Sequence, residues 1–236
     1  MSYDVIIVGG SYAGLSAGLQ LARARRRVLV IDAGVRRNRF ASHSHGFLGQ
    51  DGRAPDEIAA DGRAELMDYP TVTWQVGEAG EVQPDGEGFV VTLRGGQRVA
   101  ARRLILAGGV RDELPAIDGL AERWGRQVFH CPYCHGYELD QGRIGVLAVS
   151  PMSIHHAMML PDWGSTTFFL NGAFVPDAEQ LEQLARRGVV VEPDRVQSIS
   201  GERVDVNLAD GRSVALDGLF VMPRTHQGSP LATQLG

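Results

Sequence analysis

The sequence predicts an α/β protein built from two tandem three-layer domains, the second inserted into the first. The order strand, turn, helix, strand occurs twice, the second time about 140 residues after the first. Each occurrence is followed by a two-stranded pattern around a turn and then by one more strand. Thirty glycines in 236 residues also favour many tight turns between strands and helices.

The first copy begins at the N-terminus with "YDVIIVGGSYAGLSAGLQLARARRRVLVIDAG". Val5–Val8 is a short continuous run of β-branched residues, which is typical of a parallel strand covered on both faces. A glycine turn and a helix with regularly spaced leucines follow, and Val28–Ile31 forms the next strand, which ends at Asp32. Alternating residues on either side of Gly95–Gly96 predict the two-stranded pattern.

The second copy, "RIGVLAVSPMSIHHAMMLPDWGSTTFFLNG", has the same order. It predicts a strand over Ile144–Val149, a helix over Pro151–Leu160 that starts at proline, and a strand over Thr166–Leu170. Asp210–Gly211 is the turn of its two-stranded pattern. Both copies therefore predict Rossmann-like domains of the dinucleotide-binding type, each with a β-meander.

Domain boundaries follow from the duplication. We expect the first domain over residues 1–112 and the second over 113–224, and the family resemblance given below implies that residues 225–236 start a return to the first domain. The segment "ELPAIDGL", with Pro115 and Gly119, is the expected hinge between them.

Composition and charge narrow the class of protein. A formal net charge of −5 argues against a nucleic-acid partner, and no apolar run approaches the ~20 residues that span a bilayer. The N-terminus passes straight into a strand without a basic and apolar leader. Two cysteines do not make a structural disulfide framework. We expect a cytoplasmic protein with no membrane or nucleic-acid partner.

The first turn, "GGSYAG", keeps most of a G-x-G-x-x-G fingerprint. Gly9 and Gly14 hold the outer positions, and Ser11 stands where the middle glycine is expected. Such a turn lets a pyrophosphate approach the N-terminus of the following helix. Asp32 ends the next strand, where an acid would hold a ribose hydroxyl. This context predicts a dinucleotide site, against the alternative of an ordinary glycine turn.

The second turn, "AVSPMS", has lost the glycines. Ala148, Ser150 and Ser153 occupy the three fingerprint positions, and Pro151 lies in the turn itself. The second strand is followed by "LNG", Leu170–Gly172, without the acid or arginine that a nicotinamide nucleotide requires. We expect this half to keep the fold and to have lost NADPH binding. The alternative is that the altered turn binds a nucleotide in another way.

Both cysteines lie in "FHCPYCHGYE", Phe129–Glu138. Cys131 and Cys134 have the Cys-x-x-Cys spacing, and Pro132 favours a helix that starts there, whose N-terminus stabilises a thiolate. His130 and His135 flank the pair and can carry protons or lower a thiol pKa.

A zinc site lacks further ligands, so no metal is expected. A buried inert pair is a second alternative. A glutaredoxin active site is a third alternative. That motif normally follows the first strand of a small thioredoxin-like domain, whereas here it precedes a strand of a Rossmann-like unit. We interpret the pair as a redox dithiol.

A flavin-type dinucleotide turn, a second fold of the same type inserted after it and Cys-x-x-Cys before the second β-α-β unit together resemble the low-molecular-weight thioredoxin reductases. The resemblance covers the whole chain and implies an FAD cofactor. It implies that Cys134 is the cysteine nearest the flavin and that Cys131 meets the substrate disulfide. "LILAGG", Leu104–Gly109, and "HGFLGQDG", His45–Gly52, match segments that border the cofactor in that family. The residues it implies as FAD contacts are Gly9, Ser11, Tyr12, Ala13, Gly14, Asp32, Ala33, His45, Gly49, Ala107 and Gly108.

The sequence departs from that family in three respects. His135 replaces the acid that follows the second cysteine, and the NADPH fingerprint is missing. The extended "CPYCHGYE" form is closer to a subgroup of dithiol oxidases that close dithiols in small molecules and pass the electrons through FAD to oxygen. The third departure is that the chain stops at Gly236, where the family's return to the first domain would begin. We therefore expect either further residues in the natural protein or weak FAD binding.

We therefore expect an FAD-dependent thiol–disulfide oxidoreductase that does not bind NADPH and resembles the dithiol oxidases. Cys131, Cys134, His135 and His130 are the expected catalytic residues. An NADPH-dependent thioredoxin reductase is the alternative within the class, and a non-catalytic binding module is the alternative outside it. A thioredoxin-like protein or a small-molecule dithiol or disulfide is the expected partner, and we expect a homodimer.

Overall fold

The computed structural model describes residues 3–236 and divides the chain into two compact units. Unit 1 consists of residues 1–39, 53–111 and 225–236, and unit 2 of residues 40–52 and 112–224. The chain thus enters unit 2 twice and returns to unit 1 at its C-terminal end, and each unit is described separately below. The predicted α/β fold with two Rossmann-like units is confirmed.

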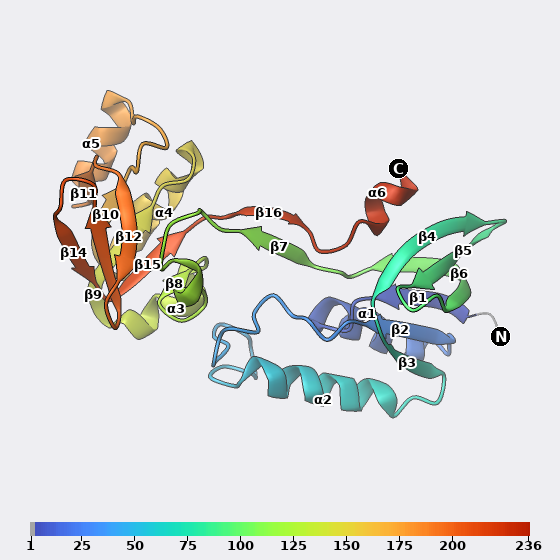
Figure 1. The fold of residues 1–236 in the computed structure, drawn as a ribbon. Helices are drawn as coiled ribbons and strands as arrows, with labels where there is room; N and C mark the ends of the chain where they lie inside the picture. The colour runs from blue at the N-terminus through green and yellow to red at the C-terminus, as the bar shows by residue number, and fades with distance from the viewer. Residues whose placement is uncertain (1–2) are drawn as a thin grey trace. The chain divides into compact units, whose positions relative to one another are not determined.

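Unit 1 is a three-layer structure. Its sheet has the order β3-β2-β1-β6-β5-β4, in which the first four strands run parallel and β4, β5 and β6 form an antiparallel meander (Figure 1). The bounds are β1 Tyr3–Val8, α1 Tyr12–Arg23, β2 Val28–Asp32, α2 Pro55–Met67, β3 Val72–Val76, β4 Ala79–Asp85, β5 Gly88–Leu93, β6 Arg98–Leu106 and α6 Leu231–Leu235.

The continuous apolar run of β1 has a simple reason. Val5 and Ile7 pack on the helical layer of α1 and α2, whereas Ile6 and Val8 pack on the layer formed by the meander and α6. Because both faces of the strand are covered, alternate residues cannot be polar. The return segment is fixed to this unit by Leu231, which is fully buried, and by Gln234, whose side-chain amide accepts from Val82 N and donates to Gly80 O.

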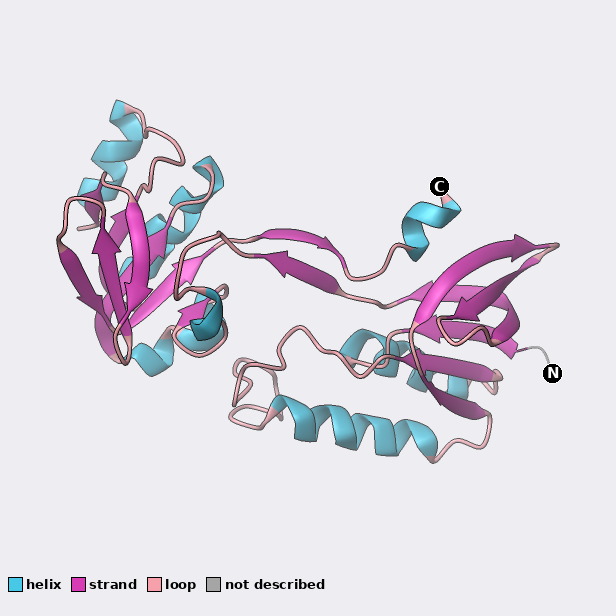
Figure 2. Ribbon diagram, viewed as in Figure 1, coloured by secondary structure: helices cyan, strands magenta, loops and turns pink. Residues whose placement is uncertain are grey.

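Unit 2 repeats the three layers. Its parallel sheet has the order β11-β10-β9-β15-β8, with the short helices on one face and the three-stranded meander β12-β13-β14 on the other (Figure 2). The bounds are β8 Val128–Phe129, α3 Pro132–His135, β9 Gln141–Leu147, α4 Ile154–Met159, β10 Gly164–Phe169, α5 Ala178–Arg186, β11 Val190–Glu192, β12 Val196–Ser200, β13 Val204–Leu208, β14 Ser213–Leu216 and β15 Gly218–Val221.

The chain passes between the units on either side of the segment 40–52 and again in the strands β7 (Val110–Glu113) and β16 (Arg224–Gln227), which pair with each other. The hinge expected at "ELPAIDGL" is wrong, because this segment packs within unit 2. Leu120 is fully buried in its core, and Asp118 O accepts from Ile199 N at 2.8 Å. Among residues 3–236, no helix is long and apolar enough to cross a membrane.

Gly119 gives a test of this packing. It has φ +80°, and a Cβ built on it would stand 1.9 Å from Ile199 O. We expect Gly119→Ala to lower the free energy of unfolding of unit 2 by about 3 kcal/mol, because strain and a backbone clash add together. The matched control is Gly188→Ala, where φ is +71° but an added Cβ meets no atom of the described chain within 4 Å, so that about 1–2 kcal/mol is expected. Urea unfolding of both variants measures the difference, and equal losses would contradict the packing role.

Candidate functional site

The turn between β1 and α1 is built on two very close backbone contacts. A Cβ on Gly9, which has φ +109°, would stand 2.3 Å from Ala107 O, and a Cβ on Gly14 would stand 1.8 Å from Gly9 O. Only glycine allows both approaches. They bring the start of α1 against the end of β1. Because no side chain projects from these two positions, a phosphate can approach the N-terminus of the helix.

Asp32 belongs to the same edge of unit 1. Its Oδ1 accepts from Gly10 N and from Gly34 N, each at 3.2 Å. The carboxylate therefore fixes the turn on one side and the chain after β2, including the exposed Ala33, on the other. Ala107 joins this edge through its N–H, which donates to Val8 O at 2.7 Å.

The remaining predicted contacts of unit 1 lie around these residues. Ser11 is the N-cap of α1, and the first turn of that helix contains no acidic residue, so the positive end of the helix dipole is not neutralised. The hydroxyl of Tyr12 donates to Pro55 O at 3.1 Å, while Ala13 is exposed. Gly108 lies against Ser229 of the return segment. The narrow glycine turn, the helix N-terminus and Asp32 suit the pyrophosphate and ribose of a dinucleotide.

The corresponding turn of unit 2 is constructed differently. The backbone N–H of Val149 donates to the hydroxyl of Ser153 at 3.1 Å, and Ser153 is fully buried. The predicted helix over Pro151–Leu160 is broken into the 3₁₀ turn Pro151–Ser153, the six residues of α4 and a second 3₁₀ turn. Ser153 thus stands where unit 1 has Gly14, and Pro151 supplies no N–H for a phosphate at the start of the following helix.

The sequence analysis did not identify Arg195, which lies after the neighbouring strands of the same sheet. The guanidinium group of Arg195 lies 3.2 Å from where a Cβ on Gly172 would stand, just after β10. The sequence analysis examined only the residues that follow β10 directly. Arg195 comes from the loop after β11, which the parallel order β11-β10 places beside it.

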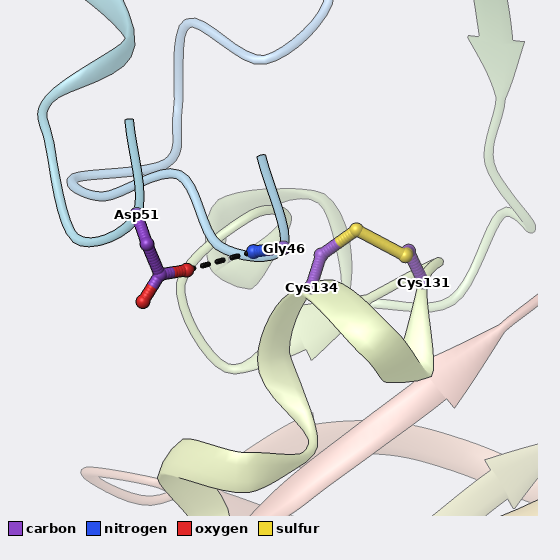
Figure 3. The surroundings of a disulfide bond; sticks show 4 residues. All are labelled: Gly46, Asp51, Cys131 and Cys134. Atoms are coloured by element: carbon purple, nitrogen blue, oxygen red, sulfur yellow. Dashed lines mark hydrogen bonds between the residues drawn. A yellow bond between two sulfur atoms is a disulfide. The ribbon is translucent and has the colours of Figure 1, made fainter. Parts of the chain in front are cut away.

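The cysteine pair forms a disulfide between Cys131 and Cys134, with the Cα atoms 5.3 Å apart (Figure 3). The predicted helix start at Pro132 is confirmed, but α3 is a single turn of four residues. Gly136 follows it with helical dihedral angles and is closely packed, because a Cβ there would stand 2.7 Å from both Pro132 O and the Trp163 ring. A one-turn helix has few aligned peptide dipoles, so neighbouring side chains must contribute to the stability of a thiolate.

The two flanking histidines have different surroundings. The ring of His135 stacks on Phe129 of β8, with centroids 4.4 Å apart and an interplanar angle of 19°. Burial lowers the pKa of His135, the carboxylate of Glu138 raises it, and His45 lowers it. His130 lies 5.7 Å from the ring of His156 on α4.

The segment Phe40–Gly52 groups with unit 2 and reaches the cysteine pair, as Figure 3 illustrates with Gly46 and Asp51. His45 Nε2 lies 3.4 Å from Glu138 Oε1, and His45 Nδ1 lies 3.6 Å from Asp51 Oδ1. The sequence analysis missed both carboxylates, because Glu138 follows the motif and Asp51 belongs to a distant segment. The flavin contacts implied for His45 and Gly49 stay predictions, as do the expected domain boundaries.

No cluster of three or more histidine, cysteine, aspartate or glutamate side chains in residues 3–236 is arranged to hold a metal ion.

The chain is similar to known proteins in sequence and in structure. Residues 3–223 match the family model described as pyridine nucleotide-disulphide oxidoreductase. The thioredoxin reductase tcpT of Claviceps purpurea (strain 20.1) is 40% identical over 152 residues, which are 63% of this chain and 47% of that protein. The chain thus spans about half the length of this curated relative.

Two solved structures are similar over nearly the whole chain. The crystal structure of an oxidoreductase from Agrobacterium tumefaciens matches with a TM-score of 0.97 and 61% sequence identity. The match covers 100% of this chain and 80% of that chain. The crystal structure of HlmI has a TM-score of 0.91 and 40% identity, with 95% and 72% covered. The resemblance to the thioredoxin reductases that the sequence predicts is confirmed.

The buried His156 gives a pH-dependent prediction. Burial, followed by the nearby His130 and His155, lowers the pKa of His156 from 6.5 to about 4. Above pH 6.5 both folded and unfolded forms are neutral. Between 6.5 and about 4 only the unfolded form takes the proton, so the folded protein loses stability as the pH falls through this window.

We therefore expect His156→Phe, which cannot titrate, to reduce the loss of unfolding free energy between about pH 7 and 5. Urea midpoints at the two values measure this loss, and His226→Gln, at an exposed histidine outside unit 2, is the control. An unchanged pH dependence in His156→Phe would contradict the assignment.

Proposed function

Because the chain belongs to the pyridine nucleotide-disulphide oxidoreductase family, we propose that it passes electron pairs from a substrate dithiol through Cys131 and Cys134 to bound FAD, without using NADPH. The family implies the FAD cofactor. The observation that supports a reaction without NADPH is the contrast between the two turns: the turn of unit 1 keeps Gly9 and Gly14, whereas in the turn of unit 2 Ser153 replaces the third glycine and Pro151 removes an N–H.

The residues proposed to hold FAD lie at one edge of unit 1. The turn Gly9–Gly14 and the N-terminus of α1 would bind the pyrophosphate, and Asp32 would bind a ribose hydroxyl. When bound there, FAD would supply a two-electron acceptor for the dithiol, with oxygen as the final oxidant. Asp32 already fixes the turn through Gly10 N, so that the cradle is preorganised before the cofactor arrives.

The thiol chemistry follows from the disulfide. One substrate thiolate attacks Cys131, the Cys131–Cys134 bond breaks, and Cys134 leaves as a thiolate. The second substrate thiolate then attacks the substrate sulfur of the mixed disulfide and releases Cys131. The substrate becomes a disulfide, and the enzyme pair now holds the two electrons. His135 and His130 are proposed to carry the protons that the thiols release.

A thioredoxin-type reductase that uses NADPH is the second candidate. Two observations favour it: Arg195 stands beside Gly172 after β10, where a 2′-phosphate would need a guanidinium group, and several relatives are named thioredoxin reductases. Its substrate would be a thioredoxin-like protein rather than a small dithiol. A cytoplasmic location and a homodimer stay predictions under either candidate.

An anaerobic titration separates the two candidates. We expect dithiothreitol to bleach the visible absorbance of the FAD-loaded protein and NADPH to leave it unchanged, since the turn of unit 2 lacks the third glycine and the N–H that Pro151 removes. Cys134→Ser is the control that a dithiol should no longer bleach. Bleaching by NADPH that is lost in Arg195→Gln would establish the reductase instead. Absence of FAD binding together with inert thiols would support a non-catalytic binding module.

The roles of the two cysteines are tested with an aromatic disulfide such as 5,5′-dithiobis(2-nitrobenzoate). We expect the reduced wild-type protein to release both aryl thiols and to end without an adduct, because Cys134 resolves the mixed disulfide on Cys131. Cys134→Ser should release one aryl thiol and keep the other on Cys131, as intact mass will show. Faster reaction in Cys131→Ser than in Cys134→Ser would reverse the assigned roles.

A further inference from the structure

We propose that Glu138 and His45 form a charge pair that sets the protonation state of His135 beside the Cys131–Cys134 pair. Glu138 and His45 would be positioning residues, since they act through His135 and not on the substrate. The inference rests on the proposed dithiol exchange, in which a proton must be taken up or released next to Cys134.

The geometry holds His45 between two carboxylates. Its Nε2 lies 3.4 Å from Glu138 Oε1, and its Nδ1 lies 3.6 Å from Asp51 Oδ1. Asp51 is itself fixed, because its Oδ1 accepts from Gly46 N at 2.8 Å. The side chain of His45 is 25% exposed, that of Glu138 43% and that of Asp51 71%, so the contact with Glu138 is the better shielded from water. A segment far away in the sequence thus brings an imidazole to the cysteine motif.

The short chain between His135 and Glu138 is rigid. Gly136 N donates to Pro132 O at 2.7 Å and Leu139 N donates to Gly136 O at 3.2 Å, and the Trp163 ring packs directly on Gly136. The backbone that carries Cys134, His135 and Glu138 is therefore compact. The carboxylate of Glu138 is directed by its contact with His45.

The charged groups that act on His135 come from two elements. The 3₁₀ turn Tyr137–Leu139 contributes Glu138, and the segment Phe40–Gly52 contributes His45, with Asp51 behind it. β8 contributes only the uncharged ring of Phe129. Burial lowers the pKa of His135, the Glu138 carboxylate opposes that effect, and a protonated His45 adds to it. Glu138 and His45 thus act on His135 with opposite signs.

This opposition matters because α3 is one turn long. A protonated His135 stabilises a thiolate at the neighbouring Cys134, and a neutral His135 can accept the proton of a thiol. The balance between the two states is set by side chains, since the helix contributes little. Glu138 favours the protonated state, and pairing with His45 moderates how strongly it does so.

The test is a histidine titration by NMR on the full-length protein with the disulfide intact, in the absence of substrate. The His135 imidazole resonance is assigned by its loss in His135→Asn. We expect Glu138→Gln to move its titration midpoint to lower pH, and His45→Gln to move it to higher pH, each by roughly half to one unit. Glu138→Asp, which keeps the charge, should restore most of the first shift.

The opposite signs separate this proposal from a structural role. If the pair only docked the segment Phe40–Gly52, both variants would loosen the same contact and move the midpoint in the same direction. Shifts of equal sign, or no shift in Glu138→Gln, would overturn the proposal. The matched control is Glu202→Gln, an exposed acid of unit 2, which should leave the midpoint unchanged.

Folding of each variant is checked by the dispersion of its amide spectrum, and Glu138→Asp provides the comparison if Glu138→Gln is unstable. The result does not depend on the flavin titration. Opposite shifts at His135 together with bleaching by NADPH would retain this inference and reject the oxidase. Bleaching by dithiols without any shift at His135 would do the reverse.

Discussion

The close approach of Gly14 to the carbonyl oxygen of Gly9 is the constraint on which unit 1 depends. A Cβ at Gly14 would stand 1.8 Å from that oxygen, so any other residue would push α1 away from β1. With α1 displaced, the packing of Leu15 in the helical layer and the position of Ser11 at the helix N-terminus would both change. The same contact that completes the core therefore shapes the phosphate cradle.

Unit 2 shows what the fold does once that constraint is removed. Ser153 is accommodated because its hydroxyl accepts from Val149 N, so that this buried polar group has a hydrogen-bond partner. The following helix is short and interrupted, yet Ala157 and Leu160 still fill the core beside β9. A Rossmann-like unit can thus keep its layers by apolar packing without the glycines of the first turn.

The sequence predicted the layers well because they depend on local patterns. The apolar run of β1 and the turn Gly95–Gly96 each indicate structure from a few neighbouring residues, and both are found as predicted. The hinge failed for a different reason. Pro115 and Gly119 are common in linkers, but Gly119 is required here by the contact with Ile199 O, which no local pattern reveals. Arg195 and His45 escaped likewise, since parallel strand order and segment docking bring them to their sites.

The cysteine motif combines both kinds of information. Its spacing and Pro132 identify a dithiol and a helix start from four consecutive residues, and the disulfide and α3 agree with them. The length of α3 could not be read from the motif, because after Gly136 the chain continues as the 3₁₀ turn Tyr137–Leu139, packed against Trp163. A one-turn helix leaves a thiolate more dependent on nearby side chains, and Glu138 and His45 lie in contact with each other beside the motif. Under the proposed role of this pair, residues outside the motif would set the chemistry of the dithiol, and variation at these positions would retune it while the Cys-x-x-Cys sequence itself stays the same.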